Sequence, residues 1–124
     1  MKKNAGFTLI ELVAVMVILA ILAVIAVPQF VDLRTEARQA ATDGVAGALS
    51  SASALNYAVE MADSTKGKAV ADCADVEALL QAPLSADYNI TTPDAVALGA
   101  TKSDCVLTGP GGATADFTAI GVAL

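Results

Sequence analysis

One carboxylate near the start of a long apolar run suggests charge pairing. Glu11 is followed by residues 12–27, sixteen residues without a charge. A carboxylate near the end of a membrane-type segment costs free energy unless a cation compensates it. We therefore predict that Glu11 has a cationic partner. A carboxylate that merely reaches to the membrane interface is the alternative.

Two cysteines offer a second kind of chemistry, a disulfide bond. Cys73 and Cys105 are the only cysteines in the chain, and pairing is the expected state if this part of the chain is exported to an oxidising compartment. A bridge that closes a loop of about 33 residues would stabilise the fold by roughly 3–4 kcal/mol in the chain-entropy picture. Two unpaired buried thiols are the alternative.

The composition excludes other classes of site. The 124 residues contain no His, so a His-based acid–base site, a His-ligated metal and a multi-Cys zinc site are absent. Asp63, Asp72, Asp75 and Glu77 have no spacing that resembles a calcium loop, and we interpret them as solvated surface charge. No nucleophile–base pair stands out. We predict no enzymatic activity, no metal and no cofactor.

The charges divide the chain into two parts. After Pro28 there are five basic residues against twelve acidic ones, a balance of −7, which makes nucleic acid a poor partner. Lys2 and Lys3 precede the apolar run, so the positive-inside rule places the N-terminus in the cytoplasm. Everything after Pro28 is then expected to be exported.

The apolar run has the length of a membrane span. Residues 7–27 comprise 21 residues, and a helix of this length measures about 31 Å, close to the hydrocarbon thickness of about 30 Å. The alternative is a secretory signal cut near Val24-Ile25-Ala26, which would release a soluble exported domain. Glu11 argues against this alternative, because a signal sequence has no use for a carboxylate.

The N-terminal residues resemble those of a type IV prepilin of class a. The resemblance rests on Lys2-Lys3-Asn4-Ala5-Gly6, then Phe7-Thr8-Leu9-Ile10-Glu11-Leu12, the apolar run and Pro28, an ungapped stretch of about 28 residues. It implies that a prepilin peptidase cuts after Gly6 on the cytoplasmic side. It also implies that the new amine of Phe7 is methylated and that the apolar segment is retained.

Cleavage after Gly6 would supply the cation that Glu11 lacks. The new amine of Phe7 is positively charged, and a neighbouring subunit shifted along the filament axis could place it against Glu11. Such a pair sets the register, because a misaligned subunit would bury an unpaired carboxylate at a cost of several kcal/mol. We predict that Phe7, Glu11 and Pro28 serve assembly into a homo-oligomer. Pro28 is expected to be either a helix kink or the boundary of the membrane part.

The exported part begins with a predicted helix. From Gln29 to about Asp63 apolar residues recur with helical spacing, which together with the preceding segment predicts a helix of about 56 residues, roughly 84 Å long. So long a helix exceeds what a small domain needs and implies partners along it. One stripe is predicted to face the core: Phe30, Leu33, Ala37, Ala41, Val45, Ala48, Ala52, Leu55, Val59 and Ala62.

The remaining residues predict a small head. Residues 64–68 end the helix, Asp72 caps a short helix over residues 74–80, and strands are expected at 88–92, 105–108 and 115–120. The predicted fold is α+β and pilin-like, with a long N-terminal helix packed on a small antiparallel sheet. The predicted parts are a leader (1–6), a membrane and filament-core helix (7–28), the exported half of the helix (29–63) and the head (64–124).

The functional expectation follows from the resemblance. It implies a subunit of a type IV pilus filament that serves adhesion, surface attachment, motility or DNA uptake, held in the inner membrane and then assembled by pilus machinery into an extracellular filament. Residues 28–33 and Ala37-Arg38 also resemble the mannose-sensitive haemagglutinin subgroup. The alternative is a pseudopilin of a type II secretion system, against which the cysteine pair argues.

Overall fold

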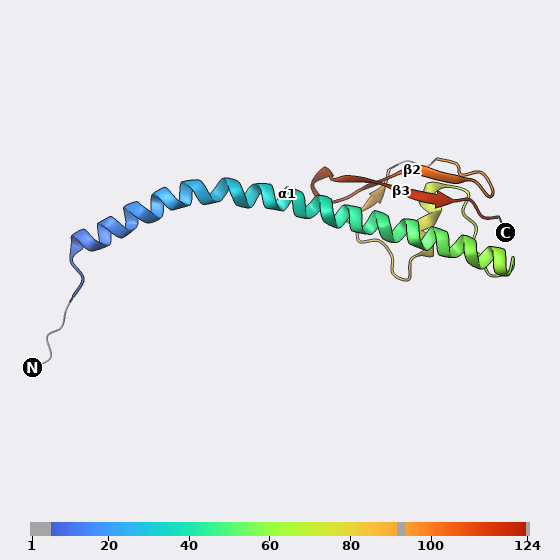
Figure 1. The fold of residues 1–124 in the computed structure, drawn as a ribbon, viewed down its shortest axis with the longest axis horizontal. Coiled ribbons are helices and arrows are strands. Elements are labelled where there is room, and N and C mark those ends of the chain that lie inside the picture. The colour runs from blue at the N-terminus through green and yellow to red at the C-terminus, as the bar shows by residue number, and fades with distance from the viewer. Residues whose placement is uncertain (1–5, 92–93, 124) are drawn as a thin grey trace, which may run out of the picture. The chain divides into compact units, whose positions relative to one another are not determined.

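A computed structural model describes residues 6–91 and 94–123, with the exception of the side chains of residues 28–32. The order of elements is α1, η1, β1, β2, η2 and β3, as Figure 1 shows. The chain divides into two compact units, Met1–Arg34 and Thr35–Leu124. We call them the N-terminal unit and the C-terminal unit and describe each by itself.

Helix α1 spans Leu9–Ala62 and has 54 residues. Residues with good helix propensity, above all Ala and Leu, fill it, and its last residue lies next to the predicted end at Asp63. The helix includes residue 28, so Pro28 lies inside a helix and is not a helix boundary. A proline there removes one backbone hydrogen bond, a loss that membrane helices tolerate.

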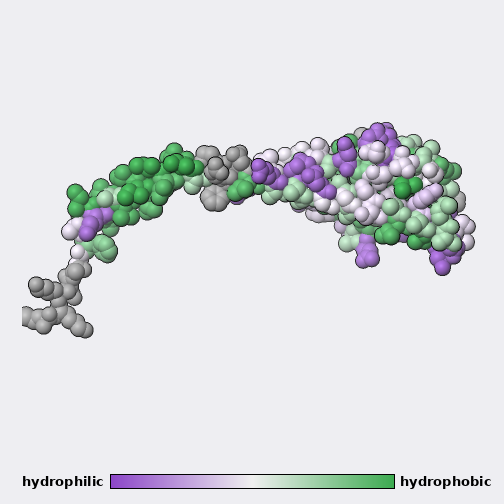
Figure 2. All heavy atoms as spheres, in the orientation of Figure 1, coloured by the Kyte–Doolittle hydropathy of each residue, from purple (hydrophilic) through white to green (hydrophobic). Residues whose placement is uncertain are grey.

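The described part of the N-terminal unit has no core of its own. Every described side chain from Phe7 to Val27 is exposed, and Leu9–Val27 forms a stretch of 19 residues that is long and apolar enough to cross a membrane. Figure 2 shows this stretch as an almost uninterrupted hydrophobic surface. So much exposed apolar area has to be covered by lipid or by other protein.

The C-terminal unit contains a three-stranded antiparallel sheet in the order β1-β2-β3. The strands are Asn89–Ile90, Thr101–Thr108 and Thr114–Ile120. Strands β2 and β3 form a hairpin around the short 3₁₀ helix η2, Pro110–Gly112. Gly111 and Gly112 have φ values of 73° and 79° there, a region that only glycine adopts without strain. The α+β pilin-like architecture predicted from the sequence is confirmed.

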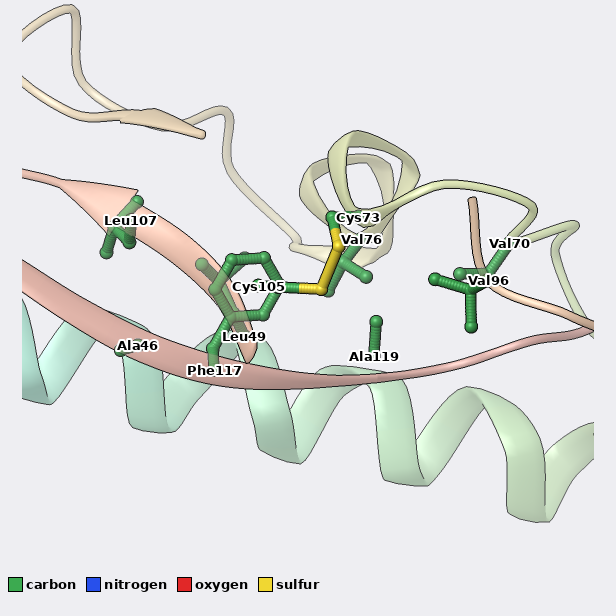
Figure 3. Close-up of a cluster of buried hydrophobic side chains, with 10 residues drawn as sticks. All are labelled: Ala46, Leu49, Val70, Cys73, Val76, Val96, Cys105, Leu107, Phe117 and Ala119. Atoms are coloured by element: carbon green, nitrogen blue, oxygen red, sulfur yellow. A yellow bond between two sulfur atoms is a disulfide. The ribbon is translucent and has the colours of Figure 1, made fainter. Parts of the chain in front are cut away.

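The core of the C-terminal unit lies where α1, η1 and the sheet meet. Phe117, Leu49 and Leu107 are the largest of its fully buried apolar side chains, and Figure 3 shows the whole cluster, with Ala46 and Leu49 coming from α1. The 3₁₀ helix η1, Cys73–Leu79, replaces the predicted short helix over residues 74–80. As expected, Asp72 caps it.

The face of α1 that packs on the sheet differs from the predicted stripe. Thr42, Ala46, Leu49 and Ser53 are buried, whereas Leu55 of the predicted stripe is 68% exposed. The reason is the free edge of β3. Ser50 Oγ accepts a hydrogen bond from the Thr118 amide at 3.0 Å and Ser53 Oγ accepts one from the Ile120 amide at 2.8 Å, while Gln39 Nε2 donates to the Thr114 carbonyl at 2.8 Å. The helix therefore turns polar residues towards the sheet, because an edge strand presents backbone groups that need partners.

Candidate functional site

The start of α1 is organised by a reciprocal contact between Thr8 and Glu11. The carboxylate oxygen Oε2 of Glu11 accepts hydrogen bonds from the Thr8 amide at 2.8 Å and from Thr8 Oγ1 at 2.9 Å. Thr8 Oγ1 in turn accepts a longer bond of 3.4 Å from the Glu11 amide. Because Leu9 is the first helical residue, Thr8 is the N-cap and Glu11 the third helical residue, which is the arrangement of a capping box.

The capping box gives Glu11 a partner within its own chain. Both side-chain hydrogen bonds go to Oε2, and among the described residues no hydrogen bond goes to Oε1. A carboxylate can accept about four bonds through its two oxygens. Glu11 can therefore cap the helix and still accept a bond from a cation on another molecule.

Thr8 is a residue of this site that the sequence argument missed. The pattern Thr8-Leu9-Ile10-Glu11 directly before an apolar run is a capping-box signature that can be read from the sequence. The negative charge in the first turn also lies at the positive end of the helix dipole, where it is favourable.

The bond between Gly6 and Phe7 lies before the helix. Phe7 is 91% exposed, and a Cβ added to Gly6 would meet no atom within 4 Å. Exposed chain outside regular structure is where proteases find their substrates. The described fold therefore offers no steric reason for a glycine at position 6.

Two of the predicted site residues are disulfide-bonded. Cys73 of η1 and Cys105 of β2 form the expected bridge across 32 residues, and both are fully buried in the core of the C-terminal unit. The bridge therefore ties η1 to the sheet and belongs to the stability of this unit. The side chain of Pro28 lies outside the described side chains, so its role in assembly stays a prediction.

The acidic residues considered for calcium have structural partners or face solvent. Asp72 and Asp75 form the capping box of η1, and Asp63 Oδ2 lies 3.3 Å from the Lys66 ammonium. Across residues 6–91 and 94–123, no group of three or more His, Cys, Asp or Glu side chains could hold a metal ion.

Comparison with known proteins identifies the N-terminal segment. Residues 1–27 match the model of the prokaryotic N-terminal methylation motif, the stretch that contains Gly6, Phe7, Thr8 and Glu11. No match was found among curated proteins or among solved structures. The resemblance to the mannose-sensitive haemagglutinin subgroup is not confirmed by these comparisons and stays a prediction.

The motif indicates how the chain is processed and assembled. It implies processing by a prepilin peptidase and entry into a pilus or secretion assembly, and the apolar helix with this motif is consistent with anchoring in a membrane before assembly. Type IV pilins, to which this motif points, are structural proteins. The N-terminal methylation motif at residues 1–27 indicates a type IV pilin-like prepilin, and the α+β architecture of the chain is pilin-like.

Proposed function

We propose that this chain is a subunit of a type IV pilus filament, cut after Gly6, methylated at Phe7 and polymerised through its N-terminal helix. The observation that carries the proposal is Glu11 Oε1, which accepts no hydrogen bond within the described part of the chain, at the start of the apolar stretch Leu9–Val27, whose residues are all exposed. Apolar surface of this extent is stable in a membrane or in the centre of a filament.

The proposed role of Glu11 is to select the register between subunits. The mature amine at Phe7 carries a positive charge, and Glu11 Oε1 offers it an acceptor while Oε2 retains the bonds to Thr8. The net free energy of one such pair is small, because desolvation offsets the Coulomb attraction. A subunit in the wrong register leaves both charges unpaired in an apolar surrounding and costs several kcal/mol.

The disulfide favours a pilus over a secretion pseudopilus. A filament outside the cell has no access to the reducing systems of the cytoplasm, and a buried bridge stabilises a head as small as this one. The extracellular filament, with roles in attachment, motility or DNA uptake, is therefore the form that we propose. Electron microscopy of material sheared from cells, with mass spectrometry of the same sample, tests it directly. Filaments containing a chain that begins at methylated Phe7 are expected.

Two variants of the capping box test whether the charge of Glu11 is needed for assembly. Glu11→Gln retains a side chain that can complete a capping box but removes the negative charge. We expect this variant to enter the membrane and to reduce the filament yield by about tenfold or more, as expected for an unpaired buried charge. Thr8→Ala removes the cap, which contributes about 1 kcal/mol to a helix, and keeps the charge. Its filaments should persist.

The two variants separate charge pairing from helix capping. Equal losses from Glu11→Gln and Thr8→Ala would show that Glu11 acts only as a cap. Normal filaments from Glu11→Gln would contradict the pairing altogether. A mature chain that begins near Val27 would contradict the filament and support a released soluble domain.

A further inference from the structure

A small hollow lies between α1 and the turn that joins β2 to β3, which Figure 1 shows beside the helix. Thr35, Arg38 and Gln39 of α1 form one side of the hollow, and residues 110–113 form the other. Its volume of about 190 Å³ is below the range of about 300–1,000 Å³ that is usual for pockets that hold drug-sized ligands. The hollow therefore suits one small chemical group.

The hollow contains a cation without an anion. The guanidinium of Arg38 and the hydroxyl of Thr35 form no hydrogen bond or ion pair with the side chains that the structure describes. Gln39 Nε2 is engaged, because it donates to Asp43 Oδ1 at 2.9 Å and to the Thr114 carbonyl at 2.8 Å. No described Asp or Glu lines the hollow. Its main free group is a planar fork of N–H donors, which matches the oxygens of a phosphate or a carboxylate.

Gly111 makes room for the guanidinium. A Cβ at this position would lie 2.6 Å from Arg38 Nη1 and 3.0 Å from Arg38 Cδ, so the arginine side chain lies against bare backbone. Gly112 has nearly the same backbone conformation, with a φ of 79° against 73° for Gly111, but a Cβ there would meet no atom within 4 Å. The position of the guanidinium therefore depends on the missing side chain at residue 111 and not on the one at residue 112.

We propose that Arg38 binds the phosphate of a phospholipid headgroup in this hollow while the chain is held in the membrane. The inference rests on the membrane-held stage of the proposed function. The apolar stretch ends at Val27, and the 11 residues of α1 from there to Arg38 measure about 16 Å. Long side chains of a helix point back towards its N-terminus. The guanidinium is therefore directed towards the bilayer.

The layer of headgroups is within reach of Arg38. This layer adds about 5–8 Å to each side of the hydrocarbon core, so about 8 Å remain between the layer and the backbone of Arg38 when the helix is upright. The length of an arginine side chain and the usual tilt of membrane helices cover this distance. Anchoring also keeps the lipid phosphates at a high effective concentration, so one contact is sufficient where free phosphate would dissociate.

The experiment uses the fact that Arg34 and Arg38 are the only arginines of the chain. Carbon-13 in the guanidinium of arginine therefore gives two NMR signals, which Arg34→Gln and Arg38→Gln assign. The full-length protein is reconstituted in bilayers of phosphatidylethanolamine and phosphatidylglycerol. Solid-state NMR of the frozen bilayers measures how strongly the lipid phosphorus-31 dephases each signal, which requires a short distance between carbon and phosphorus. Arg34 follows Val27 more closely and does not line the hollow, so it reports on the depth of insertion.

In the wild type we expect lipid phosphorus to dephase the Arg38 signal. Gly111→Ala should remove most of this dephasing, because its methyl group displaces the guanidinium, whereas Gly112→Ala should retain it. The Arg34 signal should be the same in all three proteins, and formation of the disulfide reports on folding. In phosphate-free maltoside micelles with millimolar inorganic phosphate, the Arg38 signal should show no dephasing.

Absence of dephasing at Arg38 in wild-type bilayers would overturn the inference, whether the guanidinium is then bare or holds a carboxylate of another protein, and this test needs no variant to fold. Equal dephasing in the wild type and Gly111→Ala, or equal losses from Gly111→Ala and Gly112→Ala, would overturn the role of the hollow. Dephasing by inorganic phosphate as strong as that by lipid would overturn the assignment to lipid. None of these results affects the filament. Absence of sheared filaments from wild-type cells would instead overturn the proposed function and leave the phosphate contact standing.

Discussion

The two units of this protein differ in where their apolar side chains lie. In the C-terminal unit Phe117, Leu49 and Leu107 are fully buried and a disulfide lies among them. In Leu9–Val27 no residue is buried within the chain. In the C-terminal unit this burial provides free energy for folding in water. The N-terminal unit is stable only where its surroundings are apolar. Its environment can therefore change from lipid to protein without a change of fold.

A leucine-to-alanine substitution should lower the free energy of unfolding much more in the C-terminal unit than in the N-terminal unit. Leu49→Ala should lower the free energy of unfolding of the C-terminal unit by about 3–5 kcal/mol, because it leaves a cavity in the core. Leu19→Ala, on the same helix but 58% exposed, should change it by about 0.5 kcal/mol or less. Denaturant unfolding of the purified full-length protein in detergent, followed by tyrosine fluorescence, measures both. Similar losses from the two variants would contradict the division into units.

The disulfide should stabilise one unit and leave the other unaffected. The double variant Cys73→Ala, Cys105→Ala removes a bridge between residues 32 positions apart and should cost roughly 3–4 kcal/mol in the C-terminal unit. Insertion of the N-terminal helix into the membrane should remain at the wild-type level, and alkaline extraction of membranes measures it. Loss of insertion in this variant would show that the two units do not behave independently.

The polar face of α1 provides a smaller test within the C-terminal unit. Ser53→Ala leaves the Ile120 amide without its partner and should cost about 1–3 kcal/mol, the penalty of an unsatisfied buried donor. Ser51→Ala is the control, because Ser51 is exposed and its hydroxyl donates only to the Gly47 carbonyl of its own helix. Hydrogen exchange at the Ile120 amide measures the local effect. Equal protection in both variants would contradict the proposed role of Ser53.

The smallest effect concerns a surface ion pair of the C-terminal unit. The Lys102 ammonium lies 3.1 Å from Asp104 and 3.4 Å from Asp94. Its hydrogen bond lowers the pKa of Asp104 and raises the pKa of Lys102. A carboxylate with a lowered pKa stabilises the fold at neutral pH, and this contribution disappears as the pH falls below about 4. The lysine's contribution disappears as the pH rises above about 10.5.

Lys102→Met should therefore be slightly less stable than the wild type at pH 7 and equal to it at about pH 2–3. Lys68→Met is the control, because its ammonium donates to the Ala78 carbonyl and not to a carboxylate, so acid should not remove its effect. Thermal unfolding across this pH range measures both. A difference between wild type and Lys102→Met that persists in acid would exclude the ion pair as its cause.

Local patterns were sufficient to predict much of the fold. The helical period and the capping residue Asp72 each depend on neighbours within a few residues. The cysteine pair was predicted because the chain has only two. Strand β2 starts earlier than predicted, at Thr101, since its first residues, Thr101 to Asp104, are mostly exposed and polar and show no apolar alternation.

The face of α1 could not be predicted from periodicity. The sequence contains an apolar stripe with good helical spacing, and the usual rule places such a stripe inside. The orientation depends on contacts with residues far away in the sequence, among them the β3 amides that donate to Ser50 and Ser53 from 68 and 67 residues away. In the candidate site, Glu11 could be identified from the sequence because it is a charged residue next to an apolar run. Its capping partner Thr8 was missed, although the pattern is local.

The three hydrogen bonds between α1 and β3 also protect the protein from misassembly. Gln39, Ser50 and Ser53 occupy the edge of β3 that would otherwise recruit a strand from a neighbouring molecule. The opposite edge ends in β1, which is only two residues long. A short edge strand offers little template for pairing with a strand of another molecule. Copies crowded in one place can therefore meet through their side chains without fusing their sheets.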